Sequence, residues 1–551
     1  MTEQHEIPAG LIQELREDIA CRRIQAGMKL LEANRQIYES FDGSAKNAPE
    51  FLGYFAQWVD IGYGDVRLVK ELLARMPPDV RRSFSISGYV HLHMAEGMAA
   101  MAEEESHAAI PHFEIVLMLT TEIGDGETAA IANFWKARCH RKNGEYDHAF
   151  AHTVLARDLA LQCGLPRMAA VIRVLESWLH FQRGKYKDAL STLAAAEDVL
   201  AGTDDYATLG NIQSTYGRIF RQEGRLDASM ERFAIAAQEY RKYDPQHRNL
   251  ARTLANMAYV ERLVALQFRN KIDAETARRR TARSHTPTNG ASAASWRERF
   301  QSLRAQAFHH LDEAAAIYAL HMNHHGSGTV CLHRGFLYFD NGEFDSAGEQ
   351  AAQAFALGAE KDDFILKARG RILQCMTENG KLEEGIEEGN GDPRQHAQAA
   401  LDYAREAVDF AKHTQNRRLL ARAYTWHGLT LANEFYGSLD AARELMTLAE
   451  SYLQSDFHDT AWDDLEMLRQ KVLKSSRVHH CLQEWSMGIV GDKTFQQITA
   501  EFAAIIIPKV WEAEGRKVSR VATRLSISPK KVRRILIRAG LLDSRVRAAG
   551  L

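Results

Sequence analysis

Apolar positions recur with a helical period through the middle of the chain, and short glycine-centred blocks interrupt them at regular intervals. Three of these glycines, Gly144, Gly184 and Gly224, stand 40 residues apart. A tyrosine or leucine follows each glycine by two positions, and an alanine or serine follows it by five. The block returns twice, with one weaker copy, at 341–347, 436–442 and 379–382. This regularity predicts an array of repeats.

Each block predicts the turn of a helical hairpin. Glycine readily ends a helix in the left-handed conformation, the tyrosine or leucine fills the crevice between two helices, and the small residue lets the helices approach. Further small residues stand seven positions before four of these glycines, and alanines twelve positions after them. This pattern resembles the tetratricopeptide repeat over 127–241, 327–357 and 416–452, with a period of 40 residues in place of about 34.

The resemblance implies an all-α fold, an α-α superhelix (TPR-like solenoid) whose concave face binds a protein, a peptide or a small-molecule effector. Several basic residues lie on the first helix of a hairpin by position: Arg138, Arg173, His180, Arg218, Arg221 and Arg334. The sequence leaves open whether they point toward the concave face or are ordinary surface residues. No effector-binding residue is therefore assigned.

The segments around the repeats divide the chain into further parts. Residues 1–126 are predicted to form an N-terminal helical cap and divergent hairpins. Its elements are expected to be one long amphipathic helix over 8–37, a hairpin over 49–76 that turns at 62–64, and a hairpin over 79–118. The solenoid occupies 127–475. A linker over 476–494 and a Fis-type helix-turn-helix domain over 495–551 follow it.

Two segments inside the solenoid interrupt the repeats, a longer one at 268–297 and a shorter one at 383–394. Residues 268–297 contain three consecutive arginines, Arg278, Arg279 and Arg280, and a tail rich in serine and alanine. This composition predicts a flexible basic insertion between the two helices of one repeat. Such insertions are usually solvated, and contact of the arginines with nucleic acid or another acidic partner is the alternative.

Charge is distributed unevenly along the chain. Lys and Arg number 69 against 72 Asp and Glu, which gives a formal net charge of −3. From residue 509 to the end there are 12 basic and 3 acidic residues, a net of +9, which leaves −12 for the first 508 residues. A basic module is thus attached to an acidic array.

The apolar positions of the basic segment predict two short helices around 518–525 and 529–539. Ser528 is suited to cap the second helix, and Pro529 to occupy its first turn, where a missing N–H has no cost. Both helices are expected to bury their apolar faces against a preceding helix through Ile498, Phe502, Ile506 and Val510.

Residues 521–541 resemble the Fis-type helix-turn-helix at the C-terminus of many bacterial transcription regulators. Val521 and Ala522 take the place of its paired alanines, and Gly540-Leu541 the place of its terminator. Ser526 replaces the turn glycine, which suits a turn that is not left-handed. Pro508 implies that the preceding helix is kinked there or begins there.

This second resemblance implies that the second helix of the motif enters the major groove of double-stranded DNA, with homodimers reading two half-sites. The basic side chains would neutralise phosphates and contact guanine edges. The residues implied to bind DNA are Lys517, Arg520, Ser528, Lys530, Lys531, Arg533, Arg534 and Arg538.

Sequence motifs for catalysis are absent. The phosphate loop, the dinucleotide-binding glycines, the nucleophile elbow and the zinc-protease motif do not occur, so neither an enzyme nor a cofactor is predicted. The richest histidine cluster is interpreted as satisfied or exposed histidines in preference to a metal site: His309, His310, His321, His324, His325 and His333. A metal-dependent enzyme is a remote alternative.

Compartment and function complete the expectations. Six widely spaced cysteines, an acidic N-terminus and the lack of a long apolar run predict a cytoplasmic protein without a membrane partner. The chain is predicted to be a DNA-binding transcriptional regulator whose superhelix binds an effector. The alternative is a scaffold for protein assembly, with the basic C-terminal module docking an acidic partner.

Overall fold

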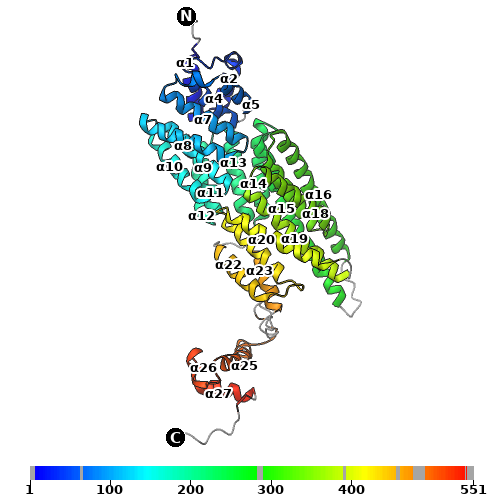
Figure 1. Ribbon diagram of the computed structural model, residues 1–551. Coiled ribbons are helices and arrows are strands. Elements are labelled where there is room, and N and C mark those ends of the chain that lie inside the picture. Colours follow the sequence, from blue (N-terminus) through cyan, green and yellow to red (C-terminus); the bar gives the residue numbers. More distant parts are fainter. Residues whose placement is uncertain are drawn as a thin grey trace. The chain divides into compact units, whose positions relative to one another are not determined.

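The computed structural model describes residues 6–61, 66–281, 290–388, 392–453, 460–475, 485, 491–539 and 541–542. All regular secondary structure in these ranges is helical (Figure 1). The chain divides into two compact units, Met1–Leu468 and Arg469–Leu551. None of the helices in the described ranges is both long and apolar enough to cross a membrane.

Eight helices precede the regular repeats. They are α1 (Ala9–Cys21), α2 (Ile24–Ala33), α3 (Arg35–Glu39), α4 (Ala48–Ile61), α5 (Val66–Ala74), α6 (Pro78–Arg81), α7 (Ile86–Ala102) and α8 (Ser106–Ile123). α4 and α5 lie where a hairpin is predicted, and the predicted turn at 62–64 falls outside the described residues. α7 and α8 form the second predicted hairpin.

The single long helix predicted over 8–37 is wrong. The chain leaves the helix at Arg22, where φ is 53°, and resumes as α2. Arg22 Nε donates to the Asp205 carboxylate at 2.7 Å, and both side chains are buried. The carboxylate of Asp204 accepts from the N–H groups of Ile24 and Gln25 at 2.8 and 2.7 Å, and so binds the start of α2. Contacts with residues about 180 positions away therefore break the helix.

The following helices build a TPR-like superhelix. They are α9 (Gly126–Asn143), α10 (Tyr146–Gln162), α11 (Pro166–Gln182), α12 (Tyr186–Leu200), α13 (Tyr206–Gln222), α14 (Leu226–Tyr243), α15 (Arg248–Thr281), α16 (Gly290–Leu320), α17 (His324–Phe339), α18 (Phe344–Glu360), α19 (Phe364–Glu388), α20 (Pro393–Lys412), α21 (Arg417–Leu431), α22 (Leu439–Tyr452) and α23 (Thr460–Ser475). Helices α9 to α22 pair as consecutive antiparallel hairpins, and α23 follows the last of them. The all-α superhelical fold predicted from the sequence is confirmed.

The hairpin glycines have the predicted backbone conformation. φ is 82° at Gly144, 74° at both Gly184 and Gly224, and 80° at Gly342. In this region a side chain is strained, which explains the glycine at each turn. The small residue five positions later is fully buried in all four of these turns, at Ala149, Ala189, Ser229 and Ala347.

The weak copy of the block at 379–382 is not a turn. Gly380 lies inside the continuous helix α19. A Cβ atom there would stand 2.5 Å from the ring of Phe344, so this glycine serves close packing between α19 and α18. A glycine needed for packing and one needed for a turn cannot be told apart by spacing alone.

The flexible insertion predicted over 268–297 is mostly helix. α15 continues to Thr281 and α16 begins at Gly290, while 282–289 lie outside the described residues. Ala265, Phe300 and Leu303 are buried together between the two extended helices, and Phe268 packs against them. This apolar seam holds the pair together well beyond the ordinary repeat length.

Beyond the end of α23, the described part of the C-terminal unit contains three helices, α25 (Phe495–Ala513), α26 (Val518–Arg524) and α27 (Pro529–Arg538). They enclose a core of Ile507, Trp511, Val521, Ala522, Val532 and Leu536. α25 runs through Pro508, so it does not begin there. The predicted linker over 476–494 lies mostly outside the described residues.

The buried face of α25 differs from the prediction. Ile507 and Trp511 face the core, whereas Phe502, predicted to be buried, is 48% exposed. Three consecutive isoleucines, 505–507, allow more than one apolar stripe on this helix, and the sequence did not identify which one packs.

Candidate functional site

The C-terminal unit presents the residues predicted to bind DNA on its surface. Lys517 is the N-cap residue of α26 and Arg520 lies on that helix, while Ser528 is the N-cap residue of α27. All eight predicted residues are exposed, the remaining five along α27: Lys530, Lys531, Arg533, Arg534 and Arg538. We refer to these eight side chains as the basic surface.

The basic surface is not neutralised by the unit's own carboxylates. Among the described residues from 491 to 542, the ion pairs join Lys493 to Glu501 and Arg524 to Glu514, outside the eight residues. Val532 and Leu536, on the opposite side of α27, are fully buried in the core. The helix is therefore fixed by its apolar face, and its cations remain available to a partner.

The turn between α26 and α27 is left-handed, contrary to the expectation for Ser526. Its φ is 51°. The N–H of Ile527 donates to the carbonyl of Ala522 at 3.0 Å, and that of Ser526 to Thr523 at 3.3 Å. These two bonds close α26 as a Schellman motif, in which glycine is preferred at the left-handed position. Ser528 Oγ then accepts from the N–H of Lys531 at 3.3 Å and caps α27.

A second positively charged surface lies within the repeat unit. It consists of arginines from the first helices of five hairpins, which we call the arginine cluster: Arg141 of α9, Arg218 and Arg221 of α13, Arg252 of α15, Arg369 of α19 and Arg418 of α21. Each side chain is partly accessible to solvent. Their mutual electrostatic effects show that the superhelix brings together residues as far apart in the sequence as Arg221 and Arg418.

Burial and like charge both oppose protonation in this cluster. Burial, followed by the charges of Arg252 and Arg138, lowers the pKa of Arg141 to about 9. Burial also lowers the pKa of Arg221 to about 10, and Arg418 contributes in the same direction. The pKa of Arg218 falls well below its usual value for the same two reasons. Lowered arginine pKa values indicate a site where positive charges outnumber the nearby negative ones.

The contacts of the cluster are with neutral groups. Arg221 donates to the Asn256 side-chain oxygen at 2.8 Å, and Arg252 to that of Asn211 at 2.7 Å. The Arg141 guanidinium lies 5.2 Å from the ring centre of Trp178. In the described ranges no carboxylate forms an ion pair with any of five members: Arg141, Arg218, Arg221, Arg252 and Arg369.

Tyr259 reports the positive potential of this surface. Burial raises the pKa of a tyrosine, yet Arg262, Arg422 and Arg221 together lower the pKa of Tyr259 below its usual value. Two of these three arginines have carboxylate partners, Asp340 for Arg262 and Asp464 for Arg422. Arg252 and Arg218 act in the same direction on Tyr240, but burial outweighs them there and raises the pKa to about 12.

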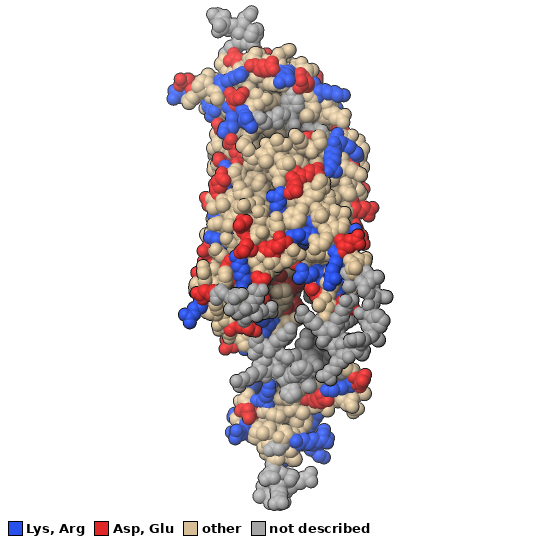
Figure 2. All heavy atoms as spheres, turned by 90° about the vertical axis from the view of Figure 1, so that its right-hand side faces the viewer, with Lys and Arg blue, Asp and Glu red and all other residues tan. Residues whose placement is uncertain are grey.

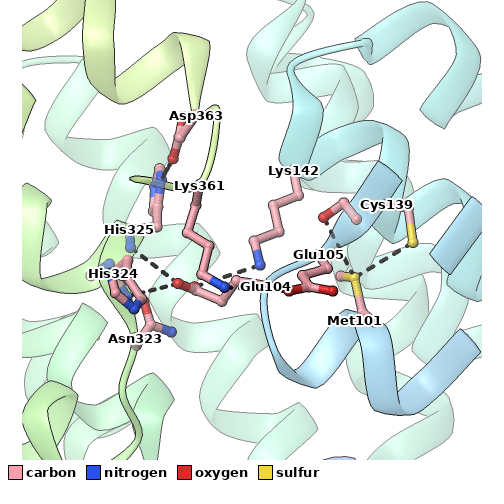
Figure 3. Close-up of polar contacts among 12 residues, drawn as sticks. Met101, Glu104, Glu105, Cys139, Lys142, Asn323, His324, His325, Lys361 and Asp363 are labelled. Atoms are coloured by element: carbon pink, nitrogen blue, oxygen red, sulfur yellow. Dashed lines mark hydrogen bonds and ion pairs between the residues drawn. The ribbon is translucent and has the colours of Figure 1, made fainter. Parts of the chain in front are cut away.

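The carboxylates next to the cluster are already bound (Figure 3). Glu104, in the turn between α7 and α8, accepts from the N–H of His324 at 2.7 Å and pairs with Lys142 at 3.5 Å. Asp363 is hydrogen-bonded to the His325 ring. These contacts join the α7–α8 turn to the start of α17.

The sequence identified part of this surface. Arg218 and Arg221 were candidates, and Arg138 adds its charge at Arg141. Arg334 is paired with Asp312, outside the cluster. Sequence reasoning missed the other four members of the cluster, Arg141, Arg252, Arg369 and Arg418. The sequence could have indicated Arg141, because it precedes a hairpin glycine by three positions, as the candidate Arg221 does.

The histidines noted in the sequence do not gather at one point. His310 Nδ1 lies 3.0 Å from Glu261, and His324 Nδ1 lies 3.2 Å from Glu360. His333 donates through Nδ1 to the carbonyl of Ala255 at 3.0 Å, and His321 contacts the carbonyl of Gln246 at 2.7 Å. Each therefore has a partner of its own.

The outer surface of the repeat unit is different in character. On the face shown in Figure 2, Lys and Arg are interspersed with Asp and Glu. Ion pairs such as Arg16–Glu127 and Arg334–Asp312 join opposite charges of the repeat unit. The arginine cluster is therefore a local excess of positive charge within a unit whose outer surface is mixed.

Comparison with known proteins finds no matching family model and no matching curated protein. Among solved structures, a Rap protein complexed with competence and sporulation factor has a TM-score of 0.47 at 11% identity, covering 81% of this chain and 98% of that one. A monomeric mutant of IFIT1 with Gppp-AAAA has a TM-score of 0.43 at 13% identity, covering 84% and 89%. The apo form of the quorum sensor NprR from B. thuringiensis has a TM-score of 0.40 at 12% identity, covering 80% and 97%.

Proposed function

We propose that this chain is a DNA-binding transcriptional regulator whose superhelix binds an acidic protein or peptide effector. One observation carries the DNA-binding part: the basic surface is fully exposed and unpaired within the described residues, while the other side of α27 is locked into the core. Lysine and arginine side chains held on a rigid helix can neutralise the phosphates of a DNA duplex.

Within this proposal α27 enters the major groove. The guanidinium groups of Arg533 and Arg534 can each form two parallel hydrogen bonds with guanine O6 and N7. Lys530 and Lys531 lie in the first turn of α27, where the free N–H groups and the positive end of the helix dipole also favour phosphate. Lys517 and Arg520, on the preceding helix, would hold the sugar–phosphate backbone.

Salt titration tests the DNA-binding part. Fluorescence anisotropy with a labelled 30-base-pair duplex should give an association constant that falls linearly with salt on logarithmic axes. Six phosphate contacts predict a slope of about −5. Binding that does not change between 50 and 200 mM salt, or no binding at low salt, would contradict the proposal.

The arginine cluster carries the effector-binding part. Five guanidinium groups without carboxylate partners make the interior attractive to an anionic segment that supplies several carboxylates. A helical-repeat superhelix presents an extended surface of the kind that accommodates a linear peptide. The same surface also supports the alternative function, a scaffold for protein assembly, which does not need DNA.

A labelled octa-glutamate peptide, with octa-glutamine as the neutral control, tests the effector-binding part. The pair Arg218→Gln with Arg252→Gln should abolish octa-glutamate binding, and octa-glutamine should not bind either protein. The pair Arg533→Glu with Arg534→Glu should leave octa-glutamate binding unchanged, because these two residues belong to the basic surface and not to the arginine cluster. If only the second pair abolished peptide binding, the acidic partner would dock on the C-terminal unit, as the scaffold alternative predicts.

A further inference from the structure

Three potential metal ligands converge between α7 and α8. His93 and Glu96 lie on α7, and His112 lies on α8. His93 Nδ1 is 3.0 Å from His112 Nδ1 and 3.1 Å from Glu96 Oε2. His112 Nδ1 is 3.2 Å from the same carboxylate oxygen. The three atoms form an almost equilateral triangle.

Hydrogen bonds alone cannot satisfy this triangle. If one proton lies between the two Nδ1 atoms, the accepting nitrogen is bare and faces the carboxylate oxygen with lone pair against lone pair. If both nitrogens carry protons directed at Glu96, the two N–H donors face each other at 3.0 Å. With Glu96 ionised, each assignment of protons leaves at least one of the three contacts unfavourable, whereas a cation in contact with all three atoms makes all of them favourable.

The dimensions fit a transition-metal ion. Bonds from zinc to histidine nitrogen and carboxylate oxygen are about 2.0–2.2 Å. Ligand atoms on one face of an octahedron then stand about 3.0 Å apart, and those of a tetrahedron about 3.4 Å apart. The observed 3.0 to 3.2 Å lies between these values. We propose that His93, Glu96 and His112 bind a divalent transition-metal ion such as zinc.

The surroundings hold the ligands in place. Arg81 donates to the other carboxylate oxygen, Oε1 of Glu96, at 2.7 Å. The Nε of the same arginine donates to the carbonyl of Met76 at 2.6 Å, which fixes the guanidinium. Gly97 lets α8 approach, because a Cβ there would stand 2.9 Å from the ring of Phe113. Arg81 is thus a positioning residue that orients Glu96.

Two histidines and a carboxylate on one face leave further coordination positions for water. The ligand side chains are 18 to 32% exposed, so an ion can reach them from solvent. Binding would join α7 to α8 within the hairpin whose turn carries Glu104. The site is independent of DNA binding and of the arginine cluster.

A second group needs to be distinguished in any test. His140, Glu145 and His148 also offer three ligand atoms close together. There His148 is exposed, and the His140 ring also stacks on that of His152 at 5.5 Å. His148→Ala is therefore the matched control for His112→Ala.

The test is metal binding by the full chain after EDTA treatment and dialysis. Zinc titration by calorimetry should show one equivalent, and cobalt should give a visible absorption band. His93→Ala and His112→Ala should each weaken zinc at least 100-fold, and Arg81→Met about 10-fold or more. His148→Ala should bind as the wild type does.

Folding is checked by circular dichroism without metal, and Glu96→Gln provides a variant of unchanged shape if a histidine variant is unstable. No binding of zinc or cobalt by the wild-type chain would overturn the proposal. Wild-type zinc affinity in a folded His112→Ala or Glu96→Gln variant would also overturn it. Loss of zinc binding in His148→Ala alone would overturn it as well. Because DNA and peptide affinity are not measured, this result is separate from the proposed function.

Discussion

Arg22 and Asp205 form a buried ion pair that joins the N-terminal helices to the start of α13. The Nε of Arg22 lies 2.7 Å from the Asp205 carboxylate, and the two side chains are 9% and 0% exposed. Asp205 also accepts from the N–H of Thr208 at 3.1 Å, so one carboxylate both pairs with Arg22 and caps α13.

Asp205→Asn should therefore destabilise the repeat unit strongly. Removing one partner of a buried pair leaves the other charge uncompensated, which costs about 3 kcal/mol. Asp158→Asn, in the more exposed pair with Arg157, should cost less than about 1 kcal/mol. Urea unfolding followed by circular dichroism measures both. Equal effects of the two substitutions would show that the buried pair has no special role.

Ser526→Gly should stabilise the C-terminal unit by about 1 kcal/mol, because a left-handed φ of 51° strains serine and suits glycine. Ser519→Gly, at an exposed position inside α26, is the control and should destabilise by a similar amount. Hydrogen exchange of the α26 and α27 amides measures the change. Slower exchange in Ser526→Gly is expected, and faster exchange would argue against the observed turn.

His333→Gln should make the chain less sensitive to mild acid. Burial, with the charges of Arg369 and Arg221, holds the pKa of His333 well below its usual value, so the folded chain does not take up this proton. The unfolded chain does so near pH 6.5, and stability is therefore lost as pH falls below that value.

For His333 the loss between pH 7.5 and 5.5 is about 1 kcal/mol. Glutamine can keep the hydrogen bond to the carbonyl of Ala255 and does not titrate. Unfolding free energies at the two pH values measure the difference between wild type and variant. The same acid loss in both proteins would contradict the assignment.

Arg218→Met should stabilise the repeat unit while weakening acidic-peptide binding. The variant removes a guanidinium that burial and neighbouring arginines disfavour. The unfolding free energy should rise by about 1 kcal/mol. Residues that are kept for binding often destabilise the fold, so that replacing them makes the protein more stable. Thermal unfolding with and without octa-glutamate gives both quantities. Loss of stability without loss of peptide binding would make Arg218 a structural residue.

Much of the fold follows from local rules that the sequence displays. Gly144, Gly184 and Gly224 mark real turns because the left-handed conformation is a local requirement of the backbone. The end of the first helix at Arg22 was not predicted, since it depends on Asp205 in another hairpin. The helices through 268–281 and 290–297 were missed because their apolar seam forms only when both are present.

The two charged surfaces also differ in how far the sequence predicts them. The basic surface could be predicted in full, because α27 is short and amphipathic and its buried and exposed sides follow from the spacing of Val532 and Leu536. The arginine cluster could not, since the superhelix decides which arginines converge. Arg221 and Arg369 come from hairpins that no local pattern connects.

The central claim is that the exposed cations of α27 bind duplex DNA. The most direct measurement is the anisotropy of a labelled duplex at low salt with Arg533→Glu combined with Arg534→Glu. Arg405→Glu with Lys412→Glu, two exposed positions on α20, gives the same change of net charge as a control. The account predicts that the first pair weakens binding at least 100-fold and that the control pair stays within about threefold of wild type. Equal binding by both proteins, or an equal loss in both, would contradict it.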